Sequence, residues 1–217
     1  MLQISDKTRK FLLKELSRKH RHYHNYAHVC HVLDTLYLMK HKFSNFRAAE
    51  LAAEFHDIVY EVDEAYEHNE INSCRMFLEK IEEDNPHLKD LDIDDPEYRT
   101  VRLALAMIGC TKGHTLDRVR NRGKFSESEI EDIKMFLDAD LRILSETEKR
   151  LQQFEKDIRK EFSQYNDEIY SHGRTQVLQS FLGRPKLYFS KFAKDEGWEQ
   201  IVRENVKILI EQLQKKD

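Results

Sequence analysis

Apolar side chains recur every three or four positions along almost the whole chain, which is the spacing of one face of an α-helix. Asn25 and Asn45 precede two of these segments and predict N-caps, because an asparagine side chain accepts hydrogen bonds from the first helical N–H groups. The pattern predicts helices over residues 5–19, 26–42, 46–60, 66–84, 97–111, 127–145, 147–164, 167–182 and 195–215. We therefore expect an all-α protein, a bundle of about eight helices.

The composition supports that expectation. Of 217 residues, 40% are hydrophobic and 35% are charged, and only 6 are glycine and 3 are proline. Such a composition suits long helices joined by short connections better than a turn-rich β architecture. The length is sufficient for one large buried core and also permits two small domains; of the two we expect a single domain over residues 1–217.

The charge pattern narrows the class of partner. A net charge of -4 disfavours binding to a nucleic-acid polymer, because proteins that bind the phosphate backbone usually carry a basic excess. Charged residues interrupt the apolar positions at the start of the chain, and no apolar run reaches the length of a membrane span. We expect a cytoplasmic protein. Its 3 cysteines include no CxxC pair, which argues against both a disulfide framework and a thiolate zinc site.

Two connections differ from the others in charge. The acidic segment EEDNPHLKDLDIDDPE contains two prolines, so we expect an exposed loop. The segment KGHTLDRVRNRGKFSES is basic, and it forms either a solvated loop or a rim that steers anions towards a site. The basic residues of this second segment are Lys112, Arg118, Arg120, Arg122 and Lys124.

An aspartate lies on the apolar face of a predicted helix. Asp140 follows Phe136 by four residues and precedes Leu144 by four, whereas Asp138 falls on the polar side of the same helix. An unpaired carboxylate in a core is costly, so Asp140 requires a cation, a metal ion or several hydrogen-bond donors. A buried salt bridge and a metal site are the two alternatives.

Polar side chains of three other segments also point inward. His56 shares an arc of its helix with three alanines, and Asp57 follows it. His28 flanks an apolar stripe, whereas His31 lies further round towards solvent, and Glu70 lies on the apolar face of its own helix. Histidines and carboxylates on inward faces of separate helices are what a metal site in a helical bundle requires. Imidazole and carboxylate ligands together favour Mn, Fe, Zn, Co or Mg.

Several motifs resemble those of a known family. The segments YHNYAH, FHDIVYE, the NE of HNEINS, TKGH, FLDADL, the GR of SHGRTQVLQSFL and the late REN are similar to the HD superfamily of metal-dependent phosphohydrolases, and most of all to a bacterial subfamily of predicted HD phosphohydrolases. The resemblance extends from about residue 21 to residue 211. It implies an HD-type helical bundle with a metal ion held by His28, His56, Asp57 and Asp140.

The resemblance also implies the cofactor, a divalent ion such as Mn, Mg, Co, Ni, Zn or Fe. We expect one ion. A second ion would need further histidine ligands, for which the candidates are His68, His87 and His114. His114 is either such a ligand or a phosphate contact, and His87 is expected to be exposed in the acidic loop.

The implied activity is hydrolysis of a phosphate ester or anhydride, with a nucleotide favoured as the small phosphorylated substrate. Asp57 would bridge the ion and a water molecule, and Glu70 would orient or deprotonate that water. A salt bridge or a helix cap is the alternative role of Glu70. The expected phosphate contacts are Lys112, His114, Arg21 and Arg174, whereas Arg159 is expected to serve as an ion-pair partner.

Two other classes of protein stay open. The same helical fold supports di-iron oxygenases, which require additional histidine ligands. A phosphate- or nucleotide-binding module without turnover would have lost a metal ligand, whereas all four expected ligands are present in this chain.

Overall fold

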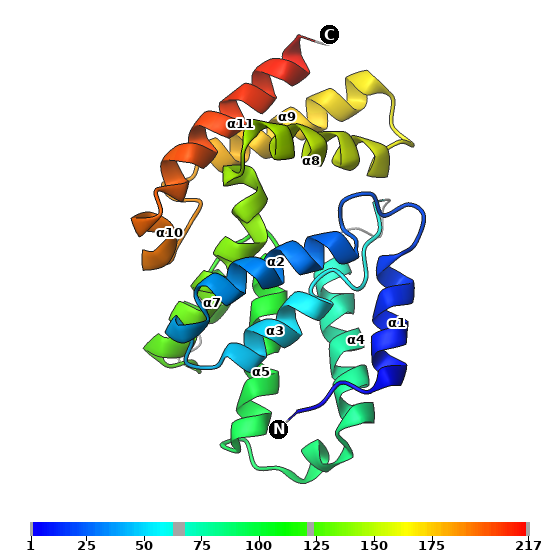
Figure 1. Cartoon of the computed structure of the whole chain (residues 1–217), viewed down its shortest axis with the longest axis vertical. Coiled ribbons are helices and arrows are strands. Elements are labelled where there is room, and N and C mark those ends of the chain that lie inside the picture. Colours follow the sequence, from blue (N-terminus) through cyan, green and yellow to red (C-terminus); the bar gives the residue numbers. More distant parts are fainter. Residues whose placement is uncertain (1, 63–67, 121–123, 216–217) are drawn as a thin grey trace.

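The structure is a computed structural model in which residues 2–62, 68–120 and 124–215 are described. Those residues form helices and no strand (Figure 1), which confirms the all-α prediction. The α-helices are α1 Asp6–Leu16, α2 Tyr26–Leu38, α3 Phe46–Phe55, α4 Asn69–Asp84, α5 Pro96–Thr111, α6 Asp117–Arg120, α7 Glu127–Asp140, α8 Glu148–Glu161, α9 Asp167–Leu182, α10 Lys191–Asp195 and α11 Trp198–Gln214. Short 3-10 helices lie between some of them, namely η1 Lys40–Lys42, η3 Pro86–Asp90 and η4 Leu141–Ser145.

Short helices explain why the structure has more elements than the sequence predicts. α6 spans 4 residues and α10 spans 5, which is too few for a helical period to be visible in the sequence. The helix predicted over 195–215 begins only at Trp198, because Gly197 adopts a left-handed conformation with φ of 70° and separates α10 from α11. Glycine adopts this conformation without the strain that a β-carbon would cause.

Both asparagine caps form as predicted. The side-chain oxygen of Asn25 accepts hydrogen bonds from the N–H groups of Ala27 (2.8 Å) and His28 (3.4 Å). Asn45 accepts from the N–H of Ala48 (3.1 Å). These bonds satisfy N–H groups that have no partner inside the first helical turn. Because Asn25 fixes the start of α2, His28 lies in the first turn of that helix.

α3 ends earlier than its apolar pattern predicts. The helix stops at Phe55 instead of Tyr60, and the chain continues in turns. Arg21, which precedes α2, donates to the main-chain oxygens of Asp57 (2.5 Å) and of the following residue (2.8 Å). These oxygens are thereby withdrawn from helical hydrogen bonding, so His56 and Asp57 stand at the C-terminal end of α3.

The buried apolar side chains form two clusters. The N-terminal cluster comprises the buried apolar residues from Leu2 to Ala139, on α1 to α7. The C-terminal cluster comprises those from Leu141 to Leu213, on η4 and α8 to α11. Figure 1 shows α8, α9 and α11 at the upper end of the molecule and most helices of the N-terminal cluster below them. The chain passes from one cluster to the other at the junction of α7 and η4, next to Asp140.

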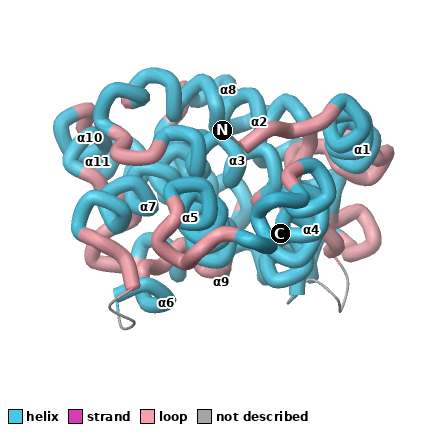
Figure 2. Tube along the Cα trace, turned by 90° about the horizontal axis from the view of Figure 1, so that it is seen from below, coloured by secondary structure: helices cyan, strands magenta, loops and turns pink. Residues whose placement is uncertain are grey.

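α3 occupies a central place in the N-terminal cluster. It packs against α2, α4, α5 and α7, and these helices surround it in the view from below (Figure 2). Ala49, Ala52 and Ala53 are fully buried. Their small side chains allow neighbouring helices to approach closely. The C-terminal end of α3 is therefore held firmly beside its neighbours.

Asp138 does not lie on a polar face, and the sequence prediction for it is wrong. The residue is 0% exposed, and its carboxylate accepts hydrogen bonds from the N–H groups of Phe189 (2.8 Å) and Ser190 (2.7 Å). Burial raises the pKa of Asp138 to about 6. The sequence pattern identified only the face of α7 that packs in the N-terminal cluster, whereas the segment before α10 covers the other face.

Candidate metal centre

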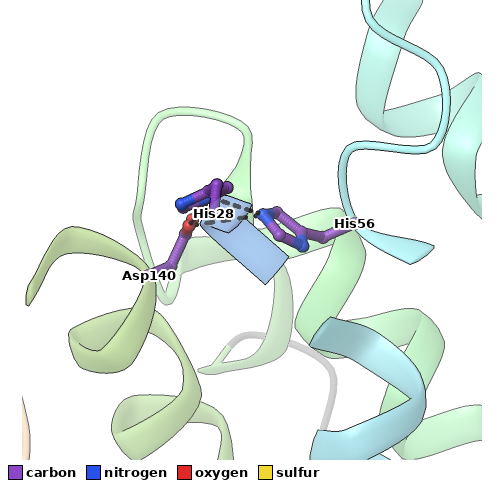
Figure 3. A group of neighbouring side chains, drawn as sticks. All are labelled: His28, His56 and Asp140. Atoms are coloured by element: carbon purple, nitrogen blue, oxygen red, sulfur yellow. Dashed lines mark hydrogen bonds and ion pairs between the residues drawn. The ribbon is translucent and has the colours of Figure 1, made fainter. Parts of the chain in front are cut away.

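Three side chains from separate elements converge at the junction of the two clusters (Figure 3). His28 comes from the first turn of α2, His56 follows the end of α3, and Asp140 is the last residue of α7. One ligand atom from each residue lies within 4.8 Å of the other two. The His28 Nε2 atom lies 3.1 Å from His56 Nε2 and 3.1 Å from Asp140 Oδ1, and His56 Nε2 lies 3.3 Å from the same carboxylate oxygen. All three residues are buried.

Asp57, the fourth expected ligand, lies beside this group. Its Oδ2 atom is 2.9 Å from His56 Nε2 and 3.5 Å from His28 Nε2. The structure thus brings Asp57 to the two histidines from the turn that follows α3. This turn is held by Arg21, which binds the main-chain oxygen of Asp57 itself.

His114 reaches the centre from the opposite direction. Its Nε2 atom is 2.8 Å from Asp140 Oδ2, the carboxylate oxygen that does not face His28. His114 and Gly113 both have left-handed backbones, with φ of 47° and 73°. A histidine rarely adopts this conformation, and here Arg184 holds the loop by donating to the Gly113 oxygen (2.9 Å). The loop backbone therefore fixes the imidazole against Asp140.

The imidazole of His56 is oriented as a metal ligand would be. Its Nδ1 donates to the main-chain oxygen of Ala53 (3.0 Å), so the lone pair of the neutral ring lies on Nε2, facing the centre. Within the described chain, Nδ1 of His28 has no hydrogen-bond partner. The His28 ring is instead packed between Tyr23 and His56, with centroid distances of 4.7 Å and 5.1 Å.

The charges of the centre favour a cation. Burial opposes protonation of His56, but the carboxylates of Asp57 and Asp140 outweigh it and raise the pKa of the imidazole well above its usual range. Burial likewise opposes ionisation of Asp140, but His56, His114 and His28 outweigh it and hold the pKa of this carboxyl well below its usual range. The carboxylates of the centre thus favour positive charge beside them, and a proton on His56 supplies part of it. A divalent ion would supply this charge with both histidines neutral, so the donor set fits a metal ion of the borderline or hard class.

Sequence reasoning missed a polar network around the centre. Glu161, on α8, is buried and accepts hydrogen bonds from the N–H groups of Tyr23 (2.7 Å) and His24 (2.8 Å). Its second oxygen lies 2.7 Å from His24 Nδ1, and the His24 ring stacks on Tyr60 with a centroid distance of 3.9 Å. Tyr23 and His24 belong to the motif YHNYAH, so a sequence motif did indicate this segment. No sequence pattern indicated Glu161, because it lies in a segment full of exposed charged residues.

A cavity of about 590 Å³ opens from the centre. Its lining includes His28, His56, Asp57 and Asp140, together with side chains of η4, α8 and α9. Three further residues predicted for the site also line it, namely Glu70, His114 and Arg174. In the described residues, Arg21 and Lys112 are not among the lining groups.

The predicted phosphate contacts thus lie in different places. Arg21 is buried, and both terminal nitrogens bind main-chain oxygens. Lys112 is exposed at the end of α5. Arg174 pairs with Glu155, its Nε 3.0 Å from a carboxylate oxygen. The rim residue Arg122 lies outside the described residues.

Two predictions about charged side chains away from the centre agree with their contacts. Arg159 pairs with Asp167 at 2.7 Å, as expected of an ion-pair partner. His87 is exposed in the acidic segment, where its Nε2 lies 2.6 Å from Glu97. His68, the remaining histidine considered for a second ion, is exposed.

The fold and the site together define an all-α protein with a buried histidine and carboxylate centre at the end of a cavity. Comparisons of the chain with protein-family models, with curated proteins and with solved structures found no match. Among the helices of the described residues, none has the length and apolar character that crossing a membrane would require.

Proposed function

We propose that the protein is a metal-dependent phosphohydrolase that cleaves a phosphate ester or anhydride. The observation that carries the proposal is the convergence of His28, His56 and Asp140 within 4.8 Å at the end of a cavity. The order of these residues, with Asp57 adjacent to His56, is also the order of the motifs that resemble the HD superfamily.

In this proposal His28, His56 and Asp140 hold the ion, and Asp57 completes the set. A bound divalent ion lowers the pKa of water and polarises a phosphoryl oxygen. The protein supplies the orientation: the bond from His56 to Ala53 fixes the ring, and Arg21 fixes the turn that carries Asp57. We therefore assign Arg21 to positioning rather than to phosphate contact.

Glu70 is the proposed general base. The Oε2 atom of Glu70 is buried and has no hydrogen-bond partner among the described residues, although the side chain lines the cavity. A buried carboxylate oxygen without a partner is costly, and a water molecule in the cavity would supply the missing donor. This environment supports a role in orienting and deprotonating the attacking water.

Two further groups are proposed to meet the phosphoryl oxygens. His114 lines the cavity beside Asp140 and would donate to the phosphate, or bind a second ion in the two-metal alternative. Tyr23 also lines the cavity, and its hydroxyl is buried without a hydrogen-bond partner in the described part of the chain. A phenol in this position would donate to an oxygen of the substrate.

The proposal is tested by stripping the purified protein of metal and reloading it separately with Mn, Mg, Co, Ni, Zn or Fe. Release of inorganic phosphate from nucleotides and from simple phosphomonoesters is then measured. Metal-dependent release is expected. Two irons per chain with oxygen-dependent turnover would point instead to an oxygenase, and phosphate binding without release by any metal form would point to a binding module.

Glu70→Gln provides the second part of the test. The variant keeps the size of the side chain and removes its basicity, so it should retain the metal and lose about 100-fold or more in kcat. The matched control is Glu79→Gln, an exposed carboxylate on the same helix. An unchanged kcat in Glu70→Gln would remove Glu70 from the mechanism.

A further inference from the structure

The cavity lining combines the polar side chains of the metal centre with an apolar wall, and we call the space beside this wall the apolar chamber. Six large apolar side chains of η4, α8 and α9 line this chamber, namely Leu144, Phe154, Ile158, Ile169, Val177 and Phe181. Ile169 and Val177 are 56% and 45% exposed, so much of their surface is free to contact a ligand. A volume of about 590 Å³ is large enough to enclose an organic group in addition to a phosphate.

A glycine in the middle of α9 keeps part of this chamber open. Ile169, Gly173 and Val177 follow one another at intervals of four residues, so they lie on one face of the helix. A β-carbon built on Gly173 would meet no atom within 4 Å. Glycine inside a helix is destabilising, and close packing within the protein does not explain it here. The free space at Gly173 therefore belongs to the chamber.

Several polar groups of the lining, unlike the Tyr23 hydroxyl and Glu70 Oε2, are already engaged with other groups of the protein. Tyr170 donates to Glu155 (2.5 Å), which also accepts from Arg174 (3.0 Å). The amide of Asn69 bonds the main-chain N–H and oxygen of Glu61 at 3.0 Å and 2.8 Å. These groups are not free to read the hydrogen-bonding edge of a nucleobase, which would leave polar atoms of the base unpaired.

The charge of the lining also limits the number of phosphates. The carboxylates of Asp57, Glu61, Glu70 and Asp140 line the cavity, and the cation Arg174 is paired with Glu155. One divalent ion would offset part of this negative charge. A phosphomonoester suits such a site better than a di- or triphosphate, whose additional charges would face carboxylates.

We propose that the substrate is a phosphomonoester of an alcohol with an apolar body, aromatic or aliphatic, that occupies the chamber while its phosphate lies at the metal centre. This inference rests on the proposed function and replaces the nucleotide favoured by the sequence with a more apolar class. Water attacks phosphorus, the bond from phosphorus to the ester oxygen breaks, and the alcohol leaves with a proton while inorganic phosphate remains.

Substrates with matched leaving groups test the proposal. 3-Phenylpropyl phosphate and ethyl phosphate both release a primary alcohol, so their intrinsic reactivities are similar. With the metal-loaded protein, kcat/KM should be about 10- to 100-fold higher for the phenylpropyl ester, because burial of the phenylpropyl group adds binding energy. AMP should be hydrolysed more slowly than the phenylpropyl ester, and ATP more slowly still. Equal values for the two alkyl esters, or a preference for a nucleotide, would overturn the proposed substrate class while leaving the hydrolase proposal intact.

The affinity for phosphonates tests the chamber independently of catalysis. 3-Phenylpropylphosphonate should bind about 10- to 100-fold more tightly than ethylphosphonate, as measured by titration calorimetry on both metal-loaded and metal-free protein. If no ester is hydrolysed, the proposed function fails, but the ratio of the two phosphonate affinities still shows whether the chamber binds an apolar group. Equal affinities for the two phosphonates would contradict the proposal that the chamber binds the apolar body of the substrate.

Variants of α9 locate the binding site. Gly173→Leu should fill the chamber and reduce kcat/KM for the phenylpropyl ester about 10-fold or more, with little change for ethyl phosphate. Gln179→Leu, an exposed position of α9 outside the cavity lining, is the matched control. Val177→Glu, at an exposed lining position, should give the same selective loss if Gly173→Leu does not fold. If every lining variant that folds lost the same factor in kcat/KM for the phenylpropyl ester and for ethyl phosphate, the proposal would be contradicted.

Discussion

The two apolar clusters differ in what they contribute to the cavity. The N-terminal cluster buries Phe55, Phe77 and Phe136 completely, and every residue of the candidate metal centre stands on its helices or at their ends. On the side of the C-terminal cluster, Ile169 and Val177 of α9 are largely exposed and line the cavity. In the proposed function, the packed helices on one side position the metal ligands, and the apolar wall on the other side selects the substrate. Different parts of the chain would then hold the ion and select the substrate.

Polar links join the elements of the two clusters. Asp138 on α7 accepts from Ser190 before α10, and Glu161 on α8 accepts from His24 before α2. Arg150 on α8 lies 3.0 Å from Nδ1 of His31 on α2. Each link can be broken separately, so the contribution of each to stability and to the site can be measured.

The two aspartates of α7 should give the largest contrast. Asp140→Asn removes a ligand and should weaken metal binding by at least about 100-fold. Asp138→Asn places an amide N–H against the N–H groups of Phe189 and Ser190 and should cost about 1–3 kcal/mol of unfolding free energy, while metal affinity is retained. Metal titration and urea unfolding of both variants measure the two effects.

An equal loss of metal affinity in the two variants would contradict this separation. It would mean that Asp138 positions the centre as strongly as Asp140 does. Asp195→Asn, at an exposed position of α10, is the matched control for both measurements.

Glu161→Ala should lower stability at least as much as Asp138→Asn, without the effect on metal binding expected of Asp140→Asn. The substitution leaves the N–H groups of Tyr23 and His24 and the His24 ring without their acceptor, which should cost about 3 kcal/mol. Glu161→Gln keeps one acceptor oxygen and should lose less. Urea unfolding measures both, with Lys156→Ala, at an exposed position of α8, as the control. If Glu161→Ala were as stable as this control, the network would not join the clusters.

His31 should make the contact between α2 and α8 sensitive to acid. Burial, together with the charges of Arg150 and His28, lowers the pKa of His31 from 6.5 to about 4. The unfolded chain therefore takes up a proton at a higher pH than the folded chain does. The stabilising contribution is complete above about pH 6.5 and declines as the pH falls towards 4, by about 1 kcal/mol after allowance for the partial exposure of the ring.

His31→Gln should reduce this acid-dependent loss, because glutamine can still accept from Arg150 but does not titrate in this range. The measurement is the difference in unfolding free energy between pH 7 and pH 5 for the two proteins. His41→Gln, at an exposed position of η1, should behave like the unaltered chain. The same pH dependence in all three proteins would remove His31 as its source.

Sequence patterns predicted the features that depend on interactions within a single segment. The two asparagine caps follow from their own side chains, and the inward positions of His28, His56 and Asp140 follow from helical periodicity. The prediction that Asp138 lies on the polar side of its helix was wrong because periodicity identifies one buried face of a helix, and a segment about 50 residues later covers the other.

Remote contacts explain what the sequence did not predict. The end of α3 depends on Arg21, and the location of Glu161 against His24 depends on how α8 packs on the loop before α2. The apolar chamber likewise exists only once α8, α9 and η4 are arranged around it. None of these features has a signal in the spacing of residues within one segment.

Gly173→Ala should give the smallest effect, and it is a direct test of why the two clusters differ. The added β-carbon meets no atom within 4 Å, so the substitution introduces no clash. Replacing glycine by alanine inside a helix should then raise the unfolding free energy by about 0.5–1 kcal/mol, as measured by urea unfolding. Gly109→Ala on α5 is the comparison, because its β-carbon would lie 3.7 Å from Arg118 within the packed N-terminal cluster. A destabilised Gly173→Ala would mean that α9 packs as closely as the N-terminal helices do, and the open wall on which substrate selection depends would be lost.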